Sequence, residues 1–256
     1  MIRARLLVVL LSLLLQLLPA SAVPGVNRHT AARGTPQLVA ATAVGWAPAT
    51  TQVPSVSAPS LVVCGIDRSG SAFLLVQAGL RVCAEEIAVA SPGDEIVVRW
   101  VASASYSSTA TVLRVRIPAS PGRCPNAFDL RCRRASQAAA RAAAKARRDA
   151  IRQLLSTRPT PSAATDLAGF FQAASELLAA APSGARRKLV VASDLFDTIG
   201  QAASPTLQGV SVRIAVLQSS NNLRRALVAR RAWTQFLTAH GASTVTIETA
   251  DPGASR

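Results

Sequence analysis

The stretch LVVCGIDRSGS, residues 61–71, decides the fold of this chain. Its first six residues form an apolar run that stops abruptly at an aspartate, and a glycine-containing turn follows. A run that is apolar on both faces is typical of a strand inside a covered parallel sheet. The turn after this strand therefore holds three oxygen-bearing side chains in alternate positions, Asp67, Ser69 and Ser71. Such a group at the end of a buried strand is a place to hold a small hard cation.

Apolar and amphipathic segments alternate along the rest of the chain. We expect a helix over 72–90, with one inward stripe formed by Val76, Leu80, Cys83 and Ile87. Further strands are expected at 94–103, 111–117, 188–193, 210–218 and 244–249. Further helices are expected at 134–155, from 165 to a stop at 182–184, and from 221 to 240.

Segment 111–117 (TVLRVRI) alternates in polarity and follows a short turn, which favours an antiparallel edge strand. The pattern as a whole predicts an α/β domain with a doubly wound, mostly parallel sheet, one antiparallel edge strand and helices on both faces. In such a domain ligands bind at the carboxyl ends of the strands. Asp67 and Asp194 are both expected at such ends.

The first 60 residues differ in composition from the rest. Residues 1–22 predict a secretory signal peptide, with Arg3 and Arg5 before the apolar run Leu6–Leu18 and a small-residue cleavage motif at 20–22. An uncleaved membrane anchor is the alternative. Residues 23–60 are rich in Pro, Ala, Thr and Ser, which predicts a flexible linker. The folded domain is expected over 61–252, and we expect the protein to be secreted or extracytoplasmic.

The formal net charge of +15 favours acidic partners, although a composition rich in Ala and Arg is also expected from a GC-rich genome. A basic, cysteine-containing insert is expected at 118–158, within which 134–155 forms a helix. One stripe of that helix is basic: Arg134, Arg141, Lys145, Arg148 and Arg152. This stripe is either a docking surface for an anionic membrane or polymer or simply a solvated helix face. A nucleic-acid partner is disfavoured by export and by the lack of stacking aromatics in the stripe.

The order of these features resembles a von Willebrand factor A domain with a metal-ion-dependent adhesion site. In that family D-x-S-x-S follows the first strand, a threonine opens a later helix, and an aspartate follows the next strand. The corresponding residues here are Asp67, Ser69 and Ser71 in DRSGS, Thr165 in TDLAGFF, and Asp194 in VVASDLFD. The resemblance covers residues 60–250. Two departures from the family pattern are Leu195, where a glycine commonly follows the second aspartate, and Asp197, which is close enough to compete with Asp194.

The resemblance implies a protein-interaction module that binds Mg²⁺ (or Mn²⁺) and engages an acidic residue of a partner protein. Neutral hydroxyls from Ser69, Ser71 and Thr165 would complete the coordination sphere without neutralising the ion, while Asp67 and Asp194 would supply its anionic part. The alternative is a fold of the same type whose turn acids only cap helices. A metal-free scaffold that binds an anionic polymer or membrane through the helix at 134–155 is the alternative function.

Catalytic constellations are not evident, and we expect a binding protein rather than an enzyme. The sequence contains no G-x-S-x-G, P-loop, dinucleotide-binding or zinc-ligand pattern, and only two histidines. Among the four cysteines, Cys124 and Cys132 flank a short loop and are expected to pair in an exported protein. For Cys64 and Cys83 a disulfide and two buried thiols are equally compatible with the pattern.

Overall fold

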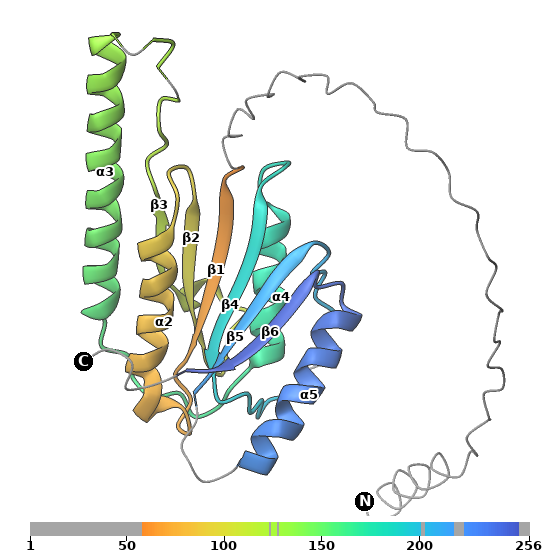
Figure 1. Cartoon of the computed structure of the whole chain (residues 1–256). Helices are drawn as coiled ribbons and strands as arrows, with labels where there is room; N and C mark the ends of the chain where they lie inside the picture. Colours follow the sequence, from red (N-terminus) through yellow and green to blue (C-terminus); the bar gives the residue numbers. More distant parts are fainter. Residues whose placement is uncertain (1–57, 123, 127, 201–202, 218–222, 251–256) are drawn as a thin grey trace, which may run out of the picture. The chain divides into compact units, whose positions relative to one another are not determined.

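The computed structural model describes residues 58–122, 124–126, 128–200, 203–217 and 223–250. Six strands and four α-helices follow the order expected from the sequence (Figure 1). The strands are β1 (Ser60–Asp67), β2 (Glu95–Val101), β3 (Thr111–Arg116), β4 (Arg186–Ser193), β5 (Val210–Val216) and β6 (Thr244–Thr249). The helices are α2 (Val76–Val89), α3 (Leu130–Leu155), α4 (Leu167–Ala179) and α5 (Leu223–Ala239), with short 3₁₀ turns at Phe73–Leu75 and Ser108–Ala110. The expected signal peptide and residues 23–57 of the expected linker lie outside the described residues and stay predictions.

The six strands form one sheet in the order β3-β2-β1-β4-β5-β6. Every neighbouring pair is parallel except β2 and β3, which are antiparallel, so β3 is the antiparallel edge strand that the sequence predicted. Because β1 lies between β2 and β4, its carboxyl end is flanked by the ends of both neighbours. This is the position at which doubly wound sheets place their ligand sites.

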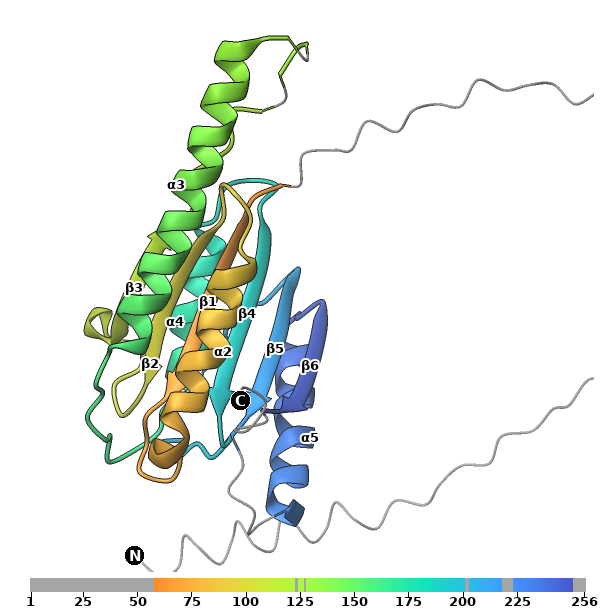
Figure 2. The ribbon, with the colours of Figure 1, turned by 60° about the vertical axis from the view of Figure 1, so that its left-hand side comes forward.

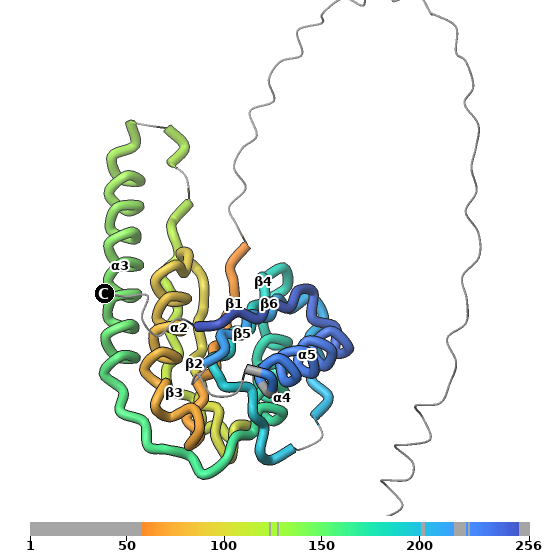
Figure 3. Tube along the Cα trace, turned by 60° about the horizontal axis from the view of Figure 1, so that its bottom comes forward, coloured from red at the N-terminus to blue at the C-terminus, as the bar shows by residue number. Residues whose placement is uncertain are grey.

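Helices cover both faces of the sheet (Figure 3). One apolar cluster packs α2 and the second half of α3 against one face of the sheet, and it includes the predicted stripe Val76, Leu80, Cys83 and Ile87. The other cluster packs α4 and α5 against the opposite face. The predicted doubly wound α/β architecture is therefore confirmed.

Three predicted helix starts were wrong by a few residues. The chain forms a turn and a 3₁₀ segment after Ser71, so α2 begins at Val76 rather than at 72. Helix α3 begins at Leu130 rather than at 134, because the Asp129 side chain accepts a hydrogen bond from the Cys132 N–H and caps it. Helix α4 begins at Leu167, where Asp166 rather than Thr165 is the capping residue.

Gly65 allows α4 to lie close to the centre of the sheet. A Cβ atom at this position would lie 2.4 Å from the Phe170 ring, which is fully buried in α4. A side chain on this residue of β1 would therefore push α4 outward. The glycine in LVVCGID thus sets the distance between the central strand and the helix that follows Thr165.

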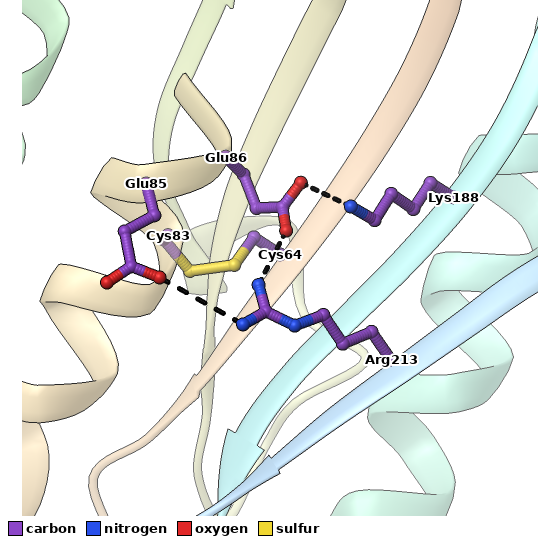
Figure 4. The surroundings of a disulfide bond; sticks show 6 residues. All are labelled: Cys64, Cys83, Glu85, Glu86, Lys188 and Arg213. Carbon is purple, nitrogen blue, oxygen red and sulfur yellow. Dashed lines mark hydrogen bonds and ion pairs between the residues drawn. A yellow bond between two sulfur atoms is a disulfide. The ribbon is translucent and has the colours of Figure 1, made fainter. Parts of the chain in front are cut away.

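A disulfide joins Cys64 of β1 to Cys83 of α2, which settles the alternative left open by the sequence (Figure 4). Beside it, Glu86 is buried and accepts hydrogen bonds from Lys188 of β4 at 2.6 Å and Arg213 of β5 at 2.8 Å (Figure 4). These pairs compensate the cost of burying the Glu86 charge, which an unpaired carboxylate would have to bear. Together they tie α2 to three neighbouring strands.

The second predicted disulfide, Cys124–Cys132, is also present and closes the loop before α3. Two disulfides are typical of proteins in oxidising compartments and agree with the prediction of export. None of the helices within the described residues is both long enough and apolar enough to cross a bilayer.

Candidate metal site

The predicted site residues come from three segments that meet at the carboxyl end of the sheet. Strands β1 and β4 pair in parallel with Ile66 opposite Ala192, so both strands end at the same level. Asp67 is the last residue of β1, and Asp194 directly follows β4. The third segment, the loop before α4, carries Thr165. It is hydrogen-bonded to Arg68 after β1, to Ala102 after β2 and to Thr198 in the loop that follows β4.

Asp67 is the fully buried carboxylate of the five predicted ligands. One carboxylate oxygen accepts a hydrogen bond from the Ser69 N–H at 2.8 Å, and the other accepts one from the Ser193 hydroxyl at 2.6 Å. Burial raises the pKa of Asp67 to about 6, although the hydrogen bonds from Ser193 and Ser69 oppose the rise, and the nearby Asp194 carboxylate adds to it. A cation placed here would remove this penalty on the ionised form.

The two serines of the D-x-S-x-S turn lie next to each other. Their hydroxyl oxygens are 3.4 Å apart, with Ser69 buried and Ser71 exposed. The backbone of the turn is bound to the loop before α4, since the Ser162 N–H donates to the Arg68 carbonyl at 2.8 Å and the Gly70 N–H donates to the Ser162 carbonyl at 3.1 Å. The turn and the loop are therefore held together as one unit.

Thr165 is the most informative residue of the site. It is fully buried, and its backbone is fixed by Thr198: the Thr165 N–H donates to the Thr198 hydroxyl at 2.8 Å, and the Thr198 N–H donates to the Thr165 carbonyl at 3.0 Å. Its own hydroxyl oxygen has no hydrogen-bond partner among the described residues. An unsatisfied buried hydroxyl costs about 1–3 kcal/mol. Because this cost has no compensation within the described residues, the Thr165 hydroxyl is a candidate ligand for a bound ion.

Asp194 is buried and accepts a hydrogen bond from the Phe196 N–H at 3.1 Å. The next residue, Leu195, has a φ of 68°, the left-handed conformation that a glycine adopts without strain. Its side chain is buried in the core beside α5, and its carbonyl accepts a hydrogen bond from the Trp233 indole at 3.0 Å. Leu195 therefore holds a left-handed conformation while its side chain is packed in the core.

Asp197 has a different role from Asp194. One of its oxygens accepts a hydrogen bond from the Ala168 N–H in the first turn of α4, and the other accepts bonds from the N–H groups of Ile199 and Gly200. These are the contacts of a turn and capping residue. Asp197 is therefore occupied with backbone groups, and Asp194 is the better candidate ligand.

The two candidate carboxylates do not accept hydrogen bonds from the first turn of α4. Asp67 and Asp194 each accept a hydrogen bond from the N–H two residues further on, within their own turns, and the first turn of α4 is capped by Asp166 and Asp197. Across the described residues, no three or more His, Cys, Asp or Glu side chains are grouped to hold a metal ion. The donor set at this site consists instead of two carboxylates and three hydroxyls, an all-oxygen set that suits Mg²⁺ or Mn²⁺. The residues present therefore fit the ion that the resemblance implies.

Three residues of the site were not predicted: Ser193, Ser162 and Thr198. They orient other groups through hydrogen bonds, Ser193 to Asp67, Ser162 to the backbone of Ser103, and Thr198 to Thr165. Only Ser193 had a usable signal in the sequence, because two parallel strands that end in Asp67 and Ser193 bring these residues to the same level.

The five residues of the predicted basic stripe, Arg134, Arg141, Lys145, Arg148 and Arg152, are all exposed on α3. Lys145 and Arg152 both pair with Asp149, at 2.6 Å and 3.6 Å. The half of the stripe nearest the sheet is therefore partly neutralised. Arg134 and Arg141, nearer the start of α3, form no ion pair within the described part of the chain.

Comparison with known proteins gave matches among solved structures alone. No protein-family model matches the chain, and no curated protein matches it. A von Willebrand factor type A protein from Catenulispora acidiphila is 16% identical, with a TM-score of 0.42 over 76% of this chain and 39% of its own. An aerotolerance-related membrane protein from Bacteroides fragilis is 13% identical, with a TM-score of 0.43 over 74% of this chain and 91% of its own.

A third similar structure, the pilus adhesin SpaC from Lactobacillus rhamnosus GG, is 15% identical, with a TM-score of 0.41. The alignment covers 77% of this chain and 29% of the adhesin, so the chain spans well under half of two of these three proteins. The fold is identified by its own topology, in which a central β1 is flanked by parallel strands and the sheet is closed on one side by the antiparallel β3. The described residues between 58 and 250 form a doubly wound α/β domain, which is the fold that the resemblance to von Willebrand factor A domains implies.

Proposed function

We propose that this domain is a protein-interaction module that binds Mg²⁺ or Mn²⁺ and, through the ion, an acidic group of a partner protein. The ligands would be Asp67, Ser69, Ser71, Thr165 and Asp194. The observation that supports this most strongly is the buried, unpartnered hydroxyl of Thr165, which lies in a loop bound to the ends of β1 and β2. When bound, the ion would supply a positive charge that two carboxylates and neutral hydroxyls leave partly uncompensated, and so could accept a carboxylate from another molecule.

The residues around the site hold the proposed ligands in place. The Asp67 carboxylate is fixed by hydrogen bonds from the Ser69 N–H and the Ser193 hydroxyl. Ser193 fixes the Asp67 carboxylate, while Thr198 fixes the backbone of Thr165.

Cation titration by calorimetry on the full chain tests the proposal. Wild-type protein is expected to bind Mg²⁺ or Mn²⁺, and Thr165→Val is expected to weaken binding by more than about tenfold, because it removes one ligand at constant shape. The same substitution should not lower the melting temperature measured in EDTA, since the lost hydroxyl has no hydrogen bond to lose.

Asp194→Asn and Asp197→Asn form a matched pair for the same titration. The first removes a proposed ligand. The second alters a capping carboxylate three residues away and leaves one amide oxygen for the N–H groups of Ile199 and Gly200, while the contact with the Ala168 N–H is lost. We expect cation binding to be lost in Asp194→Asn and retained in Asp197→Asn. Equal affinities in wild type, Thr165→Val and Asp194→Asn would contradict the proposed site.

A further inference from the structure

The first half of α3 projects beyond the body of the domain (Figures 1 and 2). The helix has 26 residues and is about 39 Å long at ~1.5 Å per residue. Its buried residues, Ala143, Ala150 and Leu154, all lie in the second half. The first half, 130–142, contributes no residue to the apolar core, and we call it the arm. Its stability therefore depends on helix propensity and on the contacts at its N-terminus.

A disulfide-closed loop forms the end of this arm. We define the tip as the described residues 124–126 and 128–134. The Cys124–Cys132 disulfide ties the loop to the first turn of α3, and the Asp129 side chain caps the helix. Within this closed loop Phe128 is 91% exposed and Leu130 is 62% exposed. Both apolar side chains are therefore exposed on a loop that is held by a disulfide and a helix cap.

The tip is also strongly basic. Arg131, Arg133 and Arg134 are exposed and form no ion pair with a described acidic residue. The acid of the tip, Asp129, is used as the helix cap. At the neighbouring edge of the sheet, one carboxylate, Glu95, is shared by two exposed arginines of β3.

The tip lies at the opposite end of the domain from the candidate metal site (Figure 1). Leu61 at the start of β1 pairs with Glu95 at the start of β2, and Glu95 pairs with Arg116 at the end of β3, after which the chain runs out to the tip. The described domain also begins at this end, just before β1. A surface bound by the tip would therefore leave the metal site facing away from it.

We propose that the tip docks on an anionic lipid bilayer, with Phe128 and Leu130 entering the interfacial region and the three arginines contacting lipid phosphates. A single exposed apolar side chain needs no explanation. Two of them within a braced loop, beside three unpaired arginines, match the combination by which peripheral segments bind acidic membranes. A soluble anionic polymer would use the arginines but would leave Phe128 and Leu130 in water, so the bilayer is the better match.

This inference is independent of the cation site, and its test uses a reporter at each end of the domain. Phe128→Trp places a tryptophan at the tip, and Leu74→Trp places one at the metal end, where the wild-type side chain is equally exposed at 91%. Each full-chain variant is mixed with vesicles of phosphatidylglycerol and phosphatidylcholine that contain brominated lipids, in EDTA. Wild-type protein, with its three tryptophans, gives the baseline.

We expect bromolipid quenching above the baseline for Phe128→Trp and none for Leu74→Trp. The excess should be absent with pure phosphatidylcholine and should fall as salt is raised. Substituting Arg131, Arg133 and Arg134 by Gln in the Phe128→Trp background should reduce partitioning about fivefold per arginine. Equal quenching at both ends, no quenching at the tip, or quenching unaffected by lipid charge would each overturn the proposal, and a loss of cation binding elsewhere would not affect it.

Discussion

At the carboxyl ends of β1 and β4 polar side chains are buried, whereas at the tip of α3 apolar side chains are exposed. Asp67 and Thr165 are fully buried at the first end, and Phe128 is 91% exposed at the second. The candidate metal site is joined to the core by hydrogen bonds between three segments, while the tip is held by one disulfide and one helix cap. Polar residues are usually exposed and apolar residues usually buried, and each end of the domain reverses one of these tendencies. We propose a function at each of the two places.

The two disulfides test whether these ends differ in their coupling to the core. We expect Cys64→Ala with Cys83→Ala to lower the free energy of unfolding by about 3 kcal/mol, because the lost cross-link closed a loop of about 20 residues and both side chains are buried. Cys124→Ala with Cys132→Ala should lower it by less than about 1 kcal/mol, because only the arm frays. Urea unfolding followed by circular dichroism measures both, and equal losses would show that the arm belongs to the cooperative core.

Gly65 and Gly70, the two glycines of the stretch 61–71, separate the effect of packing from that of the turn that carries the site. Gly65→Ala is expected to destabilise the domain by about 1–3 kcal/mol, because a Cβ there meets the Phe170 ring at 2.4 Å. Gly70→Ala is the control, since nothing lies within 4 Å of a Cβ at that position. Thermal melts should separate the two variants clearly. If Gly70→Ala destabilises as much as Gly65→Ala, the turn rather than the packing of α4 limits stability.

Asp67→Asn tests how much the buried carboxylate of the candidate metal site lowers the free energy of unfolding. The pKa of Asp67 rises from 3.8 to about 6 on folding, so the ionised carboxylate opposes folding at neutral pH, by up to about 3 kcal/mol. Replacing the carboxylate by an amide removes this penalty. Part of the gain in stability is offset, because the hydrogen bonds from Ser193 and Ser69 suit a carboxylate better than an amide. We therefore expect Asp67→Asn to be more stable than wild type by about 1 kcal/mol in EDTA at pH 7.5.

The sign of this effect depends on pH. Above about pH 6 the carboxyl is ionised in both states of the wild type, so the full penalty applies. As the pH falls from 6 towards 3.8 the folded state takes up its proton first, and the penalty disappears. Chemical unfolding at pH 7.5 and pH 4 should show the advantage of the variant only at the higher pH. A variant that is less stable at pH 7.5 would mean that the hydrogen bonds outweigh the burial of charge.

The sequence predicted the fold well because the relevant signals are local. Apolar runs that stop at Asp67 and Asp194, and the alternation in 111–117, mark strands, their ends and the one edge strand. The same pattern located the five candidate ligands on segments that do meet. Their actual coordination of a cation stays a prediction.

The signals that failed depend on contacts between distant segments. Ser162 and Thr198 orient the site through partners 59 and 33 residues away, which no local pattern records. The exposure of Phe128 could not be inferred either, since phenylalanine is among the residue types that are most often buried. The basic stripe was predicted along the whole helix, and the structure distinguishes a half paired with Asp149 from a free half only through side-chain geometry.

The cross-link between Cys64 and Cys83 has a consequence for the order in which the domain can assemble. The two cysteines are 19 residues apart, and the segment between them contains Asp67, Ser69 and Ser71. During synthesis or translocation from the N-terminus this loop can close once residue 83 is accessible, long before Thr165 and Asp194 emerge. Asp67, Ser69 and Ser71 then lie in a covalently closed loop before the segments that carry Thr165 and Asp194 fold onto it. In a reducing environment this loop would not be closed in advance.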